Sequence, residues 1–142
     1  MAEFEREVVI AASPEVIYGF LTEIDMLLQW EGTGADLDPR PGGVYSVVVS
    51  DEWRARGEFV ELVPFERIVH TFGWEGQPIG PGSTTVEYTL EPDGDKTRLR
   101  VRHTGLPEDA VEDHAQGWTH YVDRLAVVAT GGDPGPDLGP GS

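Results

Sequence analysis

Apolar and polar residues alternate along several stretches of the chain, and this alternation predicts a sheet of short strands. Residues 3–12 begin the chain with such a pattern. Further stretches with the composition of strands follow one another closely in the middle of the chain: 44–51, 55–64, 67–74, 83–90 and 97–103. The connections between them are short, and Asp93-Gly94 is a strong hairpin signal. Because short connections join antiparallel neighbours, we expect one antiparallel sheet.

Two short helices are predicted after the first strand. Ser13 can cap a helix over residues 13–21, and Pro14 suits its first position. Residues 23–30 predict the second short helix. Residues 31–43 hold four glycines and two prolines, so they are predicted to form a loop that leads into the sheet.

A long amphipathic helix is predicted near the end of the chain, after a turn at residues 104–107. Its apolar positions recur at steps of four and three residues: Val111, Ala115, Trp118, Val122, Leu125 and Ala129. No other predicted helix is long enough to cover a sheet. The element order therefore predicts an α+β fold in which a curved antiparallel sheet of about six to seven strands wraps around this C-terminal helix. A gap where such a sheet bends away from the helix is a common place for a binding cavity.

The chain has the length of one ordinary domain, and we expect that domain to occupy residues 1–130. Residues 131–142 contain eight Gly or Pro among twelve positions, so we expect them to form a flexible tail. The chain has no cysteine, which excludes disulfides, a thiolate nucleophile and cysteine-based metal sites. No leader pattern and no apolar run of membrane-spanning length occurs, so we expect a cytoplasmic protein with no membrane insertion.

The charge of the chain excludes one class of partner. Its 26 acidic and 10 basic side chains give a formal net charge of −16, which repels nucleic acids and anionic membranes. The only basic cluster is Arg98, Arg100 and Arg102, which alternate with apolar residues. We expect these arginines to form a solvated strand face with acidic cross-strand neighbours, not a nucleic-acid site.

The alternation also predicts which side chains face the helix, because neighbouring strand residues point to opposite faces. The more apolar parity of three strands gives these inward sets: Ile68, His70, Phe72 and Trp74; Val86, Tyr88 and Leu90; Leu99, Val101 and His103. Two histidines, His70 and His103, are thus expected inside. A satisfied core histidine and a histidine that lines a pocket both fit this pattern.

One flank of the long helix borders its apolar stripe and carries His114, Trp118 and Tyr121. Gly117 lies beside them, and a glycine inside a helix suggests the close approach of a strand or a ligand. His120 falls on another face, where we expect solvent exposure. His114 and His120 are six residues apart and the chain has no His-Glu-x-x-His motif, so we expect no metal and no other cofactor. No Gly-x-Ser-x-Gly elbow is present either, and we assign no catalytic residue.

Several motifs in order resemble a known family. They include "ASPEVIYGFLTEIDMLLQW", "DPRPGGVYSV", "GEFVELVPFERIVHTFGW" and "HAQGWTHYVDRL", and the resemblance extends from Phe4 to Ala129. The chain resembles the heat-shock-protein-90 ATPase activator homologue family, within the START-related SRPBCC superfamily of helix-grip folds. Relatives of this kind include lipid and sterol carriers, polyketide cyclases, hormone receptors and chaperone regulators. One departure is Glu31, which follows Trp30 where the family often has a second tryptophan, and it places an acidic group near the expected pocket mouth.

These observations favour a module that binds a small hydrophobic or aromatic ligand between the sheet and the C-terminal helix. The candidate ligand-binding residues are Trp30, His70, Phe72, Trp74, Tyr88, His103, His114, Gly117, Trp118 and Tyr121. Of these, Trp74, Tyr88 and Trp118 are expected to line one contiguous cavity. Two alternatives stay open: a cyclase-like enzyme in which a buried histidine is the general acid or base, and a module that binds a chaperone. A homodimer is compatible with each of them.

Overall fold

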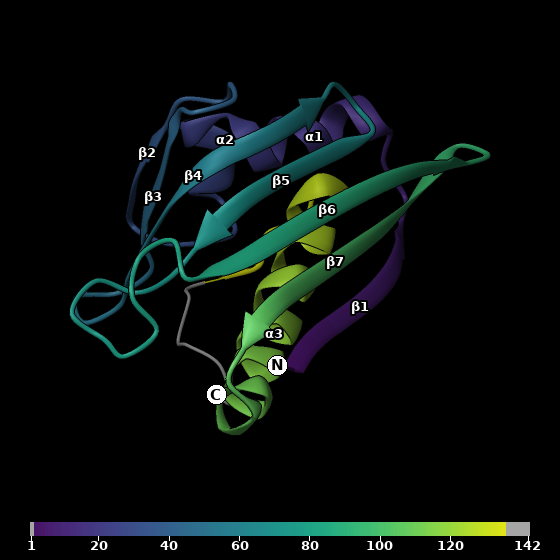
Figure 1. Ribbon diagram of the computed structural model, residues 1–142. Helices are drawn as coiled ribbons and strands as arrows, with labels where there is room; N and C mark the ends of the chain where they lie inside the picture. The colour runs from purple at the N-terminus through teal and green to yellow at the C-terminus, as the bar shows by residue number, and fades with distance from the viewer. Residues whose placement is uncertain (1, 136–142) are drawn as a thin grey trace.

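The computed structural model describes residues 2–135. They form seven strands, two short helices, a 3-10 turn and a long C-terminal helix (Figure 1). In chain order these are β1 (Ala2–Ile10), α1 (Pro14–Thr22), α2 (Ile24–Leu27), β2 (Gly34–Leu37), β3 (Val44–Val48), β4 (Arg54–Val63), β5 (Arg67–Phe72), β6 (Thr84–Asp93), β7 (Lys96–Leu106), η1 (Glu108–Ala110) and α3 (Val111–Ala129).

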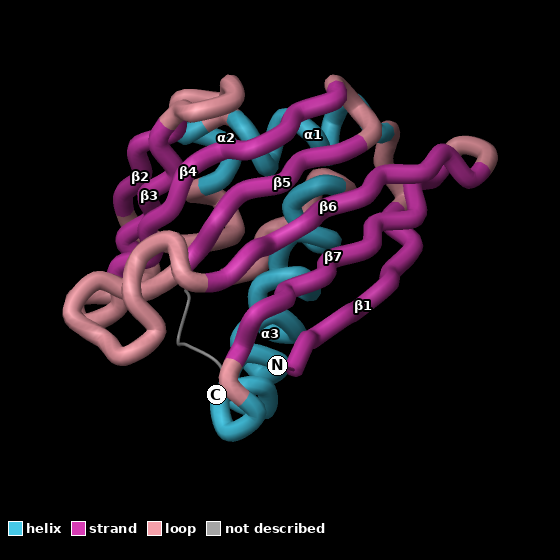
Figure 2. The backbone as a smooth tube through the Cα atoms, in the orientation of Figure 1, coloured by secondary structure: helices cyan, strands magenta, loops and turns pink. Residues whose placement is uncertain are grey.

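The strands form one sheet in the order β1-β7-β6-β5-β4-β3-β2, and every neighbouring pair is antiparallel. The first strand therefore pairs with the last one, while the other strands follow one another as hairpins. The sheet curves over α3, which lies across one of its faces, with α1 near the C-terminal end of that helix (Figures 1 and 2). The predicted α+β helix-grip fold is confirmed.

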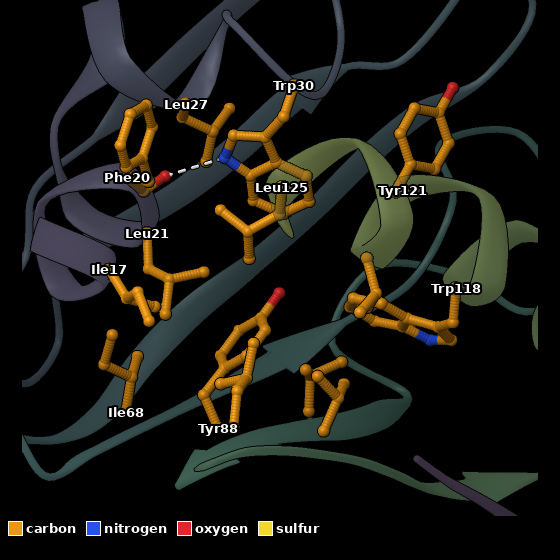
Figure 3. Close-up of a cluster of buried hydrophobic side chains, with 14 of the residues drawn as sticks. Ile17, Phe20, Leu21, Leu27, Trp30, Ile68, Tyr88, Trp118, Tyr121 and Leu125 are labelled. Atoms are coloured by element: carbon orange, nitrogen blue, oxygen red, sulfur yellow. Dashed lines mark hydrogen bonds between the residues drawn. The ribbon is translucent and has the colours of Figure 1, made fainter. Parts of the chain in front are cut away.

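The two short helices begin and end where local chemistry favours it. The Ser13 side chain accepts a hydrogen bond from the Val16 N–H of α1. Pro14 occupies the first helical position, where a backbone N–H would have no partner within the helix. A hydrogen bond holds the segment after α2 against α1, because Trp30 Nε1 donates to the Phe20 carbonyl over 2.9 Å (Figure 3). Trp30 is fully buried in this position and contributes to the core.

The two faces of the sheet divide as the alternation predicted. All three predicted inward sets point to the α3 side, and their residues on β5, β6 and β7 are buried. On the opposite face, Arg100 pairs across the strands with Glu7, and Arg102 Nε lies 2.6 Å from Glu3. The arginine cluster therefore forms ion pairs within the sheet, as expected.

Three local predictions were wrong. Residues 31–43 were expected to form only a loop, but β2 lies within them as a short edge strand whose hydrogen bonds come from β3. Residues 104–107 were expected to form a turn, but β7 continues to Leu106, with Gly105 at a φ of 83°. His120 is half-buried with its ring 4.7 Å from that of Tyr121, and is not fully exposed.

The C-terminal residues that follow α3 are described only as far as Gly135. Arg124 donates to the carbonyls of Pro134 and Gly135, and the Gly132 N–H donates to Val127. This part of the expected tail thus contacts α3. The remainder, residues 136–142, lies outside the described residues, so the flexibility of the tail stays a prediction.

Candidate functional site

A cavity of about 830 Å³ lies where the loops at one end of the sheet meet the N-terminal half of α3. The β3–β4 loop, the β5–β6 loop and the segment that leads into α3 form its walls. Its aromatic lining consists of Trp53, Phe72, Trp74, Trp118 and Tyr121. This volume lies within the range of pockets that hold drug-sized ligands, and such pockets are typically apolar with a few polar groups.

One wall is closed by a contact between the β5–β6 loop and α3. Trp74 Nε1 donates to His114 Nε2 over 3.0 Å, and His114 Nδ1 lies 2.8 Å from the Ala110 carbonyl. Because a carbonyl can only accept, Nδ1 carries the proton and Nε2 accepts from the tryptophan. Both nitrogens of the imidazole are therefore engaged in holding this wall.

A second hydrogen-bonded chain lies behind the cavity and starts at Trp118. Its Nε1 donates to His103 Nδ1 over 3.0 Å, and His103 Nε2 donates to Thr84 Oγ1 over 2.8 Å. The Thr84 hydroxyl in turn donates to the Phe72 carbonyl over 2.7 Å. His103 and Thr84 each donate one hydrogen bond and accept one, between the Trp118 donor and the Phe72 acceptor, so the buried polar atoms of this network are satisfied.

His103 is consequently held in its neutral form. Burial, with smaller contributions from the imidazoles of His114 and His70, lowers the pKa of His103 to about 3. A protonated ring would also lose the acceptor that Trp118 needs. His103 supports the wall and does not itself reach the cavity, because it is absent from the lining.

His70 lies deeper, inside an aromatic cluster. Its ring stacks on Tyr45 with the centroids 3.8 Å apart, and its Nδ1 donates to the Thr71 carbonyl over 2.8 Å. The other nitrogen, Nε2, is buried and has no hydrogen-bond partner among the described residues. Burial lowers the pKa of His70 to about 4, so this ring is also neutral near pH 7.

The ten sequence-predicted residues divide into two groups. Six of them line the cavity: Phe72, Trp74, His114, Gly117, Trp118 and Tyr121. The other four are buried behind its walls: Trp30, His70, Tyr88 and His103. Tyr88 is absent from the lining that contains Trp74 and Trp118, and its ring packs edge-on against Trp118, with the centroids 6.0 Å apart (Figure 3).

Other lining residues had not been predicted from the sequence. Trp53 belongs to the β3–β4 loop, is 43% exposed, and meets Trp74 edge-on at 5.2 Å. Asp109 and Asp113, at the start of the C-terminal helical segment, had no signal beyond the ordinary preference for acids there. Glu31 was expected near the mouth; it lines the cavity and is only 7% exposed.

The charges of this lining have one sign. Glu31, Asp109 and Asp113 contribute carboxylates, and the lining contains no lysine or arginine. Within residues 2–135, no three His, Asp or Glu side chains converge in a way that could hold a metal ion. In the same range, none of the helices combines the length and the apolar character needed to cross a bilayer.

Comparisons with known proteins agree with this fold. The human "Activator of 90 kDa heat shock protein ATPase homolog 1" is 28% identical over 109 residues, which is 77% of this chain and 31% of that protein. The chain thus spans about a third of the length of this curated relative.

Two solved structures extend the likeness over nearly the whole chain. The solution structure of an AHSA1-like protein from Rhizobium etli is 42% identical, with a TM-score of 0.78, over 96% of this chain and 87% of that one. The Aha1 dimer from Colwellia psychrerythraea is 21% identical and shares the fold, with a TM-score of 0.82 over 93% of this chain and 98% of that one. Residues 11–130 match the family described as "Activator of Hsp90 ATPase homolog 1-like protein", and the chain belongs to that family.

Proposed function

We propose that the protein binds a small hydrophobic molecule with an aromatic or alicyclic body in the cavity beside α3. The observation that carries this proposal is a cavity of about 830 Å³ with five aromatic side chains in its walls. Aromatic side chains provide a large apolar contact area with little rotational freedom to lose on binding.

The internal hydrogen bonds of the walls support binding over catalysis. The N–H groups of Trp74 and Trp118 are both used by histidines of the protein itself. A ligand therefore meets the apolar faces of these rings and does not have to satisfy their polar edges. The walls are also fixed before the ligand arrives, which lowers the entropic cost of binding.

The same hydrogen bonds leave no free imidazole nitrogen on His103 or His114 that could act as a general acid or base. His103 is behind the wall with both nitrogens occupied, and His70 is absent from the lining. His114 does line the cavity, but its two nitrogens are engaged by Trp74 and Ala110. A cyclase-like reaction that uses one of these imidazoles would first have to break a wall contact.

The test uses 1-naphthalenemethanol, a neutral aromatic alcohol, as the probe in isothermal titration calorimetry. A probe of this size should bind once per chain with a dissociation constant on the order of 0.1 mM. Trp118→Ala should weaken binding about tenfold, since it removes a large apolar wall. Val60→Ala is the matched control, because Val60 is an exposed apolar residue of β4 outside the lining. Absence of saturable binding, or equal weakening by both variants, would contradict the proposal.

A second candidate function is the binding of an Hsp90 chaperone, and membership of the family favours it. The human relative is named as an activator of this ATPase, but only 31% of its length is matched here. The direct test is the ATP hydrolysis rate of purified Hsp90 with and without this chain. A rate that does not change at saturating concentrations would eliminate this candidate and leave the ligand proposal standing. The dimeric Colwellia relative also makes a homodimer worth testing by sedimentation equilibrium.

A further inference from the structure

The chain reverses its direction after α3 and runs back along that helix. The Gly132 N–H donates to the Val127 carbonyl over 2.9 Å. Arg124, which lies nearer the start of the helix, donates from Nη1 to the carbonyls of Pro134 and Gly135 over 3.3 and 3.1 Å. Each step along this segment therefore brings the chain nearer to the N-terminal half of α3, which lines the cavity.

Arg124 lies on the face of α3 that lines the cavity. Steps of three and four residues connect it with Tyr121, Gly117 and His114, which all belong to the lining. Arg124 Nε also donates to the Trp30 carbonyl over 3.0 Å, which holds the guanidinium against the segment that follows α2. The described part of the chain thus ends beside the cavity, on the helix face that forms one of its walls.

The exposure of this segment changes along the same path. Gly131, Gly132 and Asp133 are exposed, whereas Pro134 and Gly135 are half-buried. The Asp133 carboxylate accepts a hydrogen bond from the Gly135 N–H over 2.8 Å, as in a turn closed by an aspartate. By Gly135 the chain has therefore come to lie against the protein.

The next seven residues, 136–142, lie outside the described range, but their length and composition are known. Seven residues span up to about 23 Å when extended. The stretch from Ala110 to Tyr121, which contributes to the lining, is about 17 Å long. The segment is thus long enough to cross the cavity along α3. Its one large apolar side chain is that of Leu138.

The open side of the cavity is apolar as well as exposed. Trp53 and Pro78 belong to the lining and are exposed, and Ile79 beside Pro78 is half-buried. A hydrophobic molecule in the cavity would leave part of its surface against water on this side, and covering that surface is favourable. Leu138 has the apolar side chain that such a cover needs.

We propose that residues 136–142 form a strap across the open side of the cavity, with Leu138 turned toward the aromatic lining, and that this strap covers a bound ligand. The role of the strap rests on the proposed function, whereas the contact of Leu138 with the lining needs no ligand. Asp137 repels the carboxylates of Asp109 and Asp113 in the lining, so the strap opens readily. Its contact strengthens as salt screens these charges.

The first experiment measures this contact without a ligand, by NMR of the full chain with labelled leucine methyl groups. Methyl groups held against aromatic rings resonate upfield of their position in an unstructured peptide. The Leu138 methyls should be shifted in this way and should show nuclear Overhauser effects to the ring of a lining tryptophan. Arg124→Met should reduce the shift, because the carbonyls of Pro134 and Gly135 lose their donor, whereas Asp137→Asn should retain it. Leu138 methyls at the unstructured position, with no such effects, would overturn the proposal.

The second experiment measures the role of the strap by calorimetric titration with 1-naphthalenemethanol. Truncation after Gly135 should weaken binding about threefold, and Leu138→Ser should have the same effect, since both remove the apolar cover. Asp137→Asn is the matched control and should not weaken binding, because it changes the neighbouring residue and keeps the leucine. Unchanged or tighter binding after truncation refutes the strap. If the probe does not bind to any of these chains, the proposed function fails, and docking of the segment still stands or falls with the Leu138 signals.

Discussion

Gly117 offers a direct test of the cavity, because this residue of α3 lies at the cavity wall and has no side chain. A Cβ built on Gly117 would have no heavy atom within 4 Å outside its own helix and neighbours, so this glycine faces open space. The alternative suggested by the sequence, a strand pressed against the helix at this point, is excluded by that distance. Gly117→Ala should therefore gain helix propensity, up to about 1 kcal/mol in the free energy of unfolding. For a domain of this size, that gain corresponds to a rise of about 4 °C in Tm.

Binding should respond differently from stability. One methyl group occupies a small part of a cavity of about 830 Å³, so Gly117→Ala should weaken binding of 1-naphthalenemethanol by no more than about threefold. Gly117→Phe places a ring in the same space and should weaken binding by more than about tenfold while the protein still folds. Stability and affinity are thus expected to move in opposite directions in Gly117→Ala.

The assay is thermal unfolding with and without the probe, together with calorimetric titration of each variant. Gly19→Ala in α1 is the control, because its new Cβ would lie 3.1 Å from atoms of Glu23 and Met26. That crowding should cancel much of the gain in propensity, and the affinity should stay unchanged since Gly19 is outside the lining. If Gly117→Ala instead lowers the free energy of unfolding by about 1–3 kcal/mol, the site is solidly packed and the reasoning about the cavity is refuted.

Three further predictions follow from the buried hydrogen bonds. His70 and His103, with pKa values lowered to about 4 and about 3, are neutral when folded, and the unfolded chain binds their protons more readily below about pH 6.5. Their contribution is complete above that pH and is lost as the pH falls toward 4, by about 1 kcal/mol per pH unit for each ring. Urea unfolding at pH 7, 6 and 5 should show this slope, and an equal slope in His70→Phe would contradict it for that residue. Trp118→Phe leaves His103 Nδ1 without its donor and should cost about 1–3 kcal/mol in the free energy of unfolding. The double variant with His103→Phe then measures the coupling energy between these two side chains. Removal of residues 133–142 should cost about 1 kcal/mol or less, because Arg124 loses the Pro134 and Gly135 carbonyls but keeps that of Trp30; a larger drop in Tm would show that the tail is packed.

The strands and their inward faces could be predicted because each carries its own evidence in the alternation of side chains. The faces of β5, β6 and β7 are examples, and the phase of α3 followed in the same way from its apolar stripe. β2 could not be predicted, because a four-residue edge strand has no room for a pattern and depends on hydrogen bonds to β3. The extension of β7 was hidden for a related reason, since Gly105 and the proline after Leu106 resemble a turn.

The residues that line the cavity were predicted less completely than the fold. Alternation along a strand predicts on which face of the sheet a side chain lies, but not whether other side chains separate it from the cavity. Tyr88 and His103 point to the α3 side as expected, but they end behind the wall because Trp118 covers both rings. Trp53 enters the lining from a loop, and loop positions are set by long-range contacts that a local pattern does not contain.

The hydrogen bonds of the histidines link the fold to the lining of the cavity. Trp74 and Trp118 each have a polar N–H that would otherwise need a partner in the cavity. Each N–H instead donates to an imidazole nitrogen of the protein itself. Because His103 and His114 are used in this way, the cavity presents ring faces while its remaining charges are carboxylates. Specificity at such a site has to come from shape and from the sign of charge, not from a directional bond to histidine.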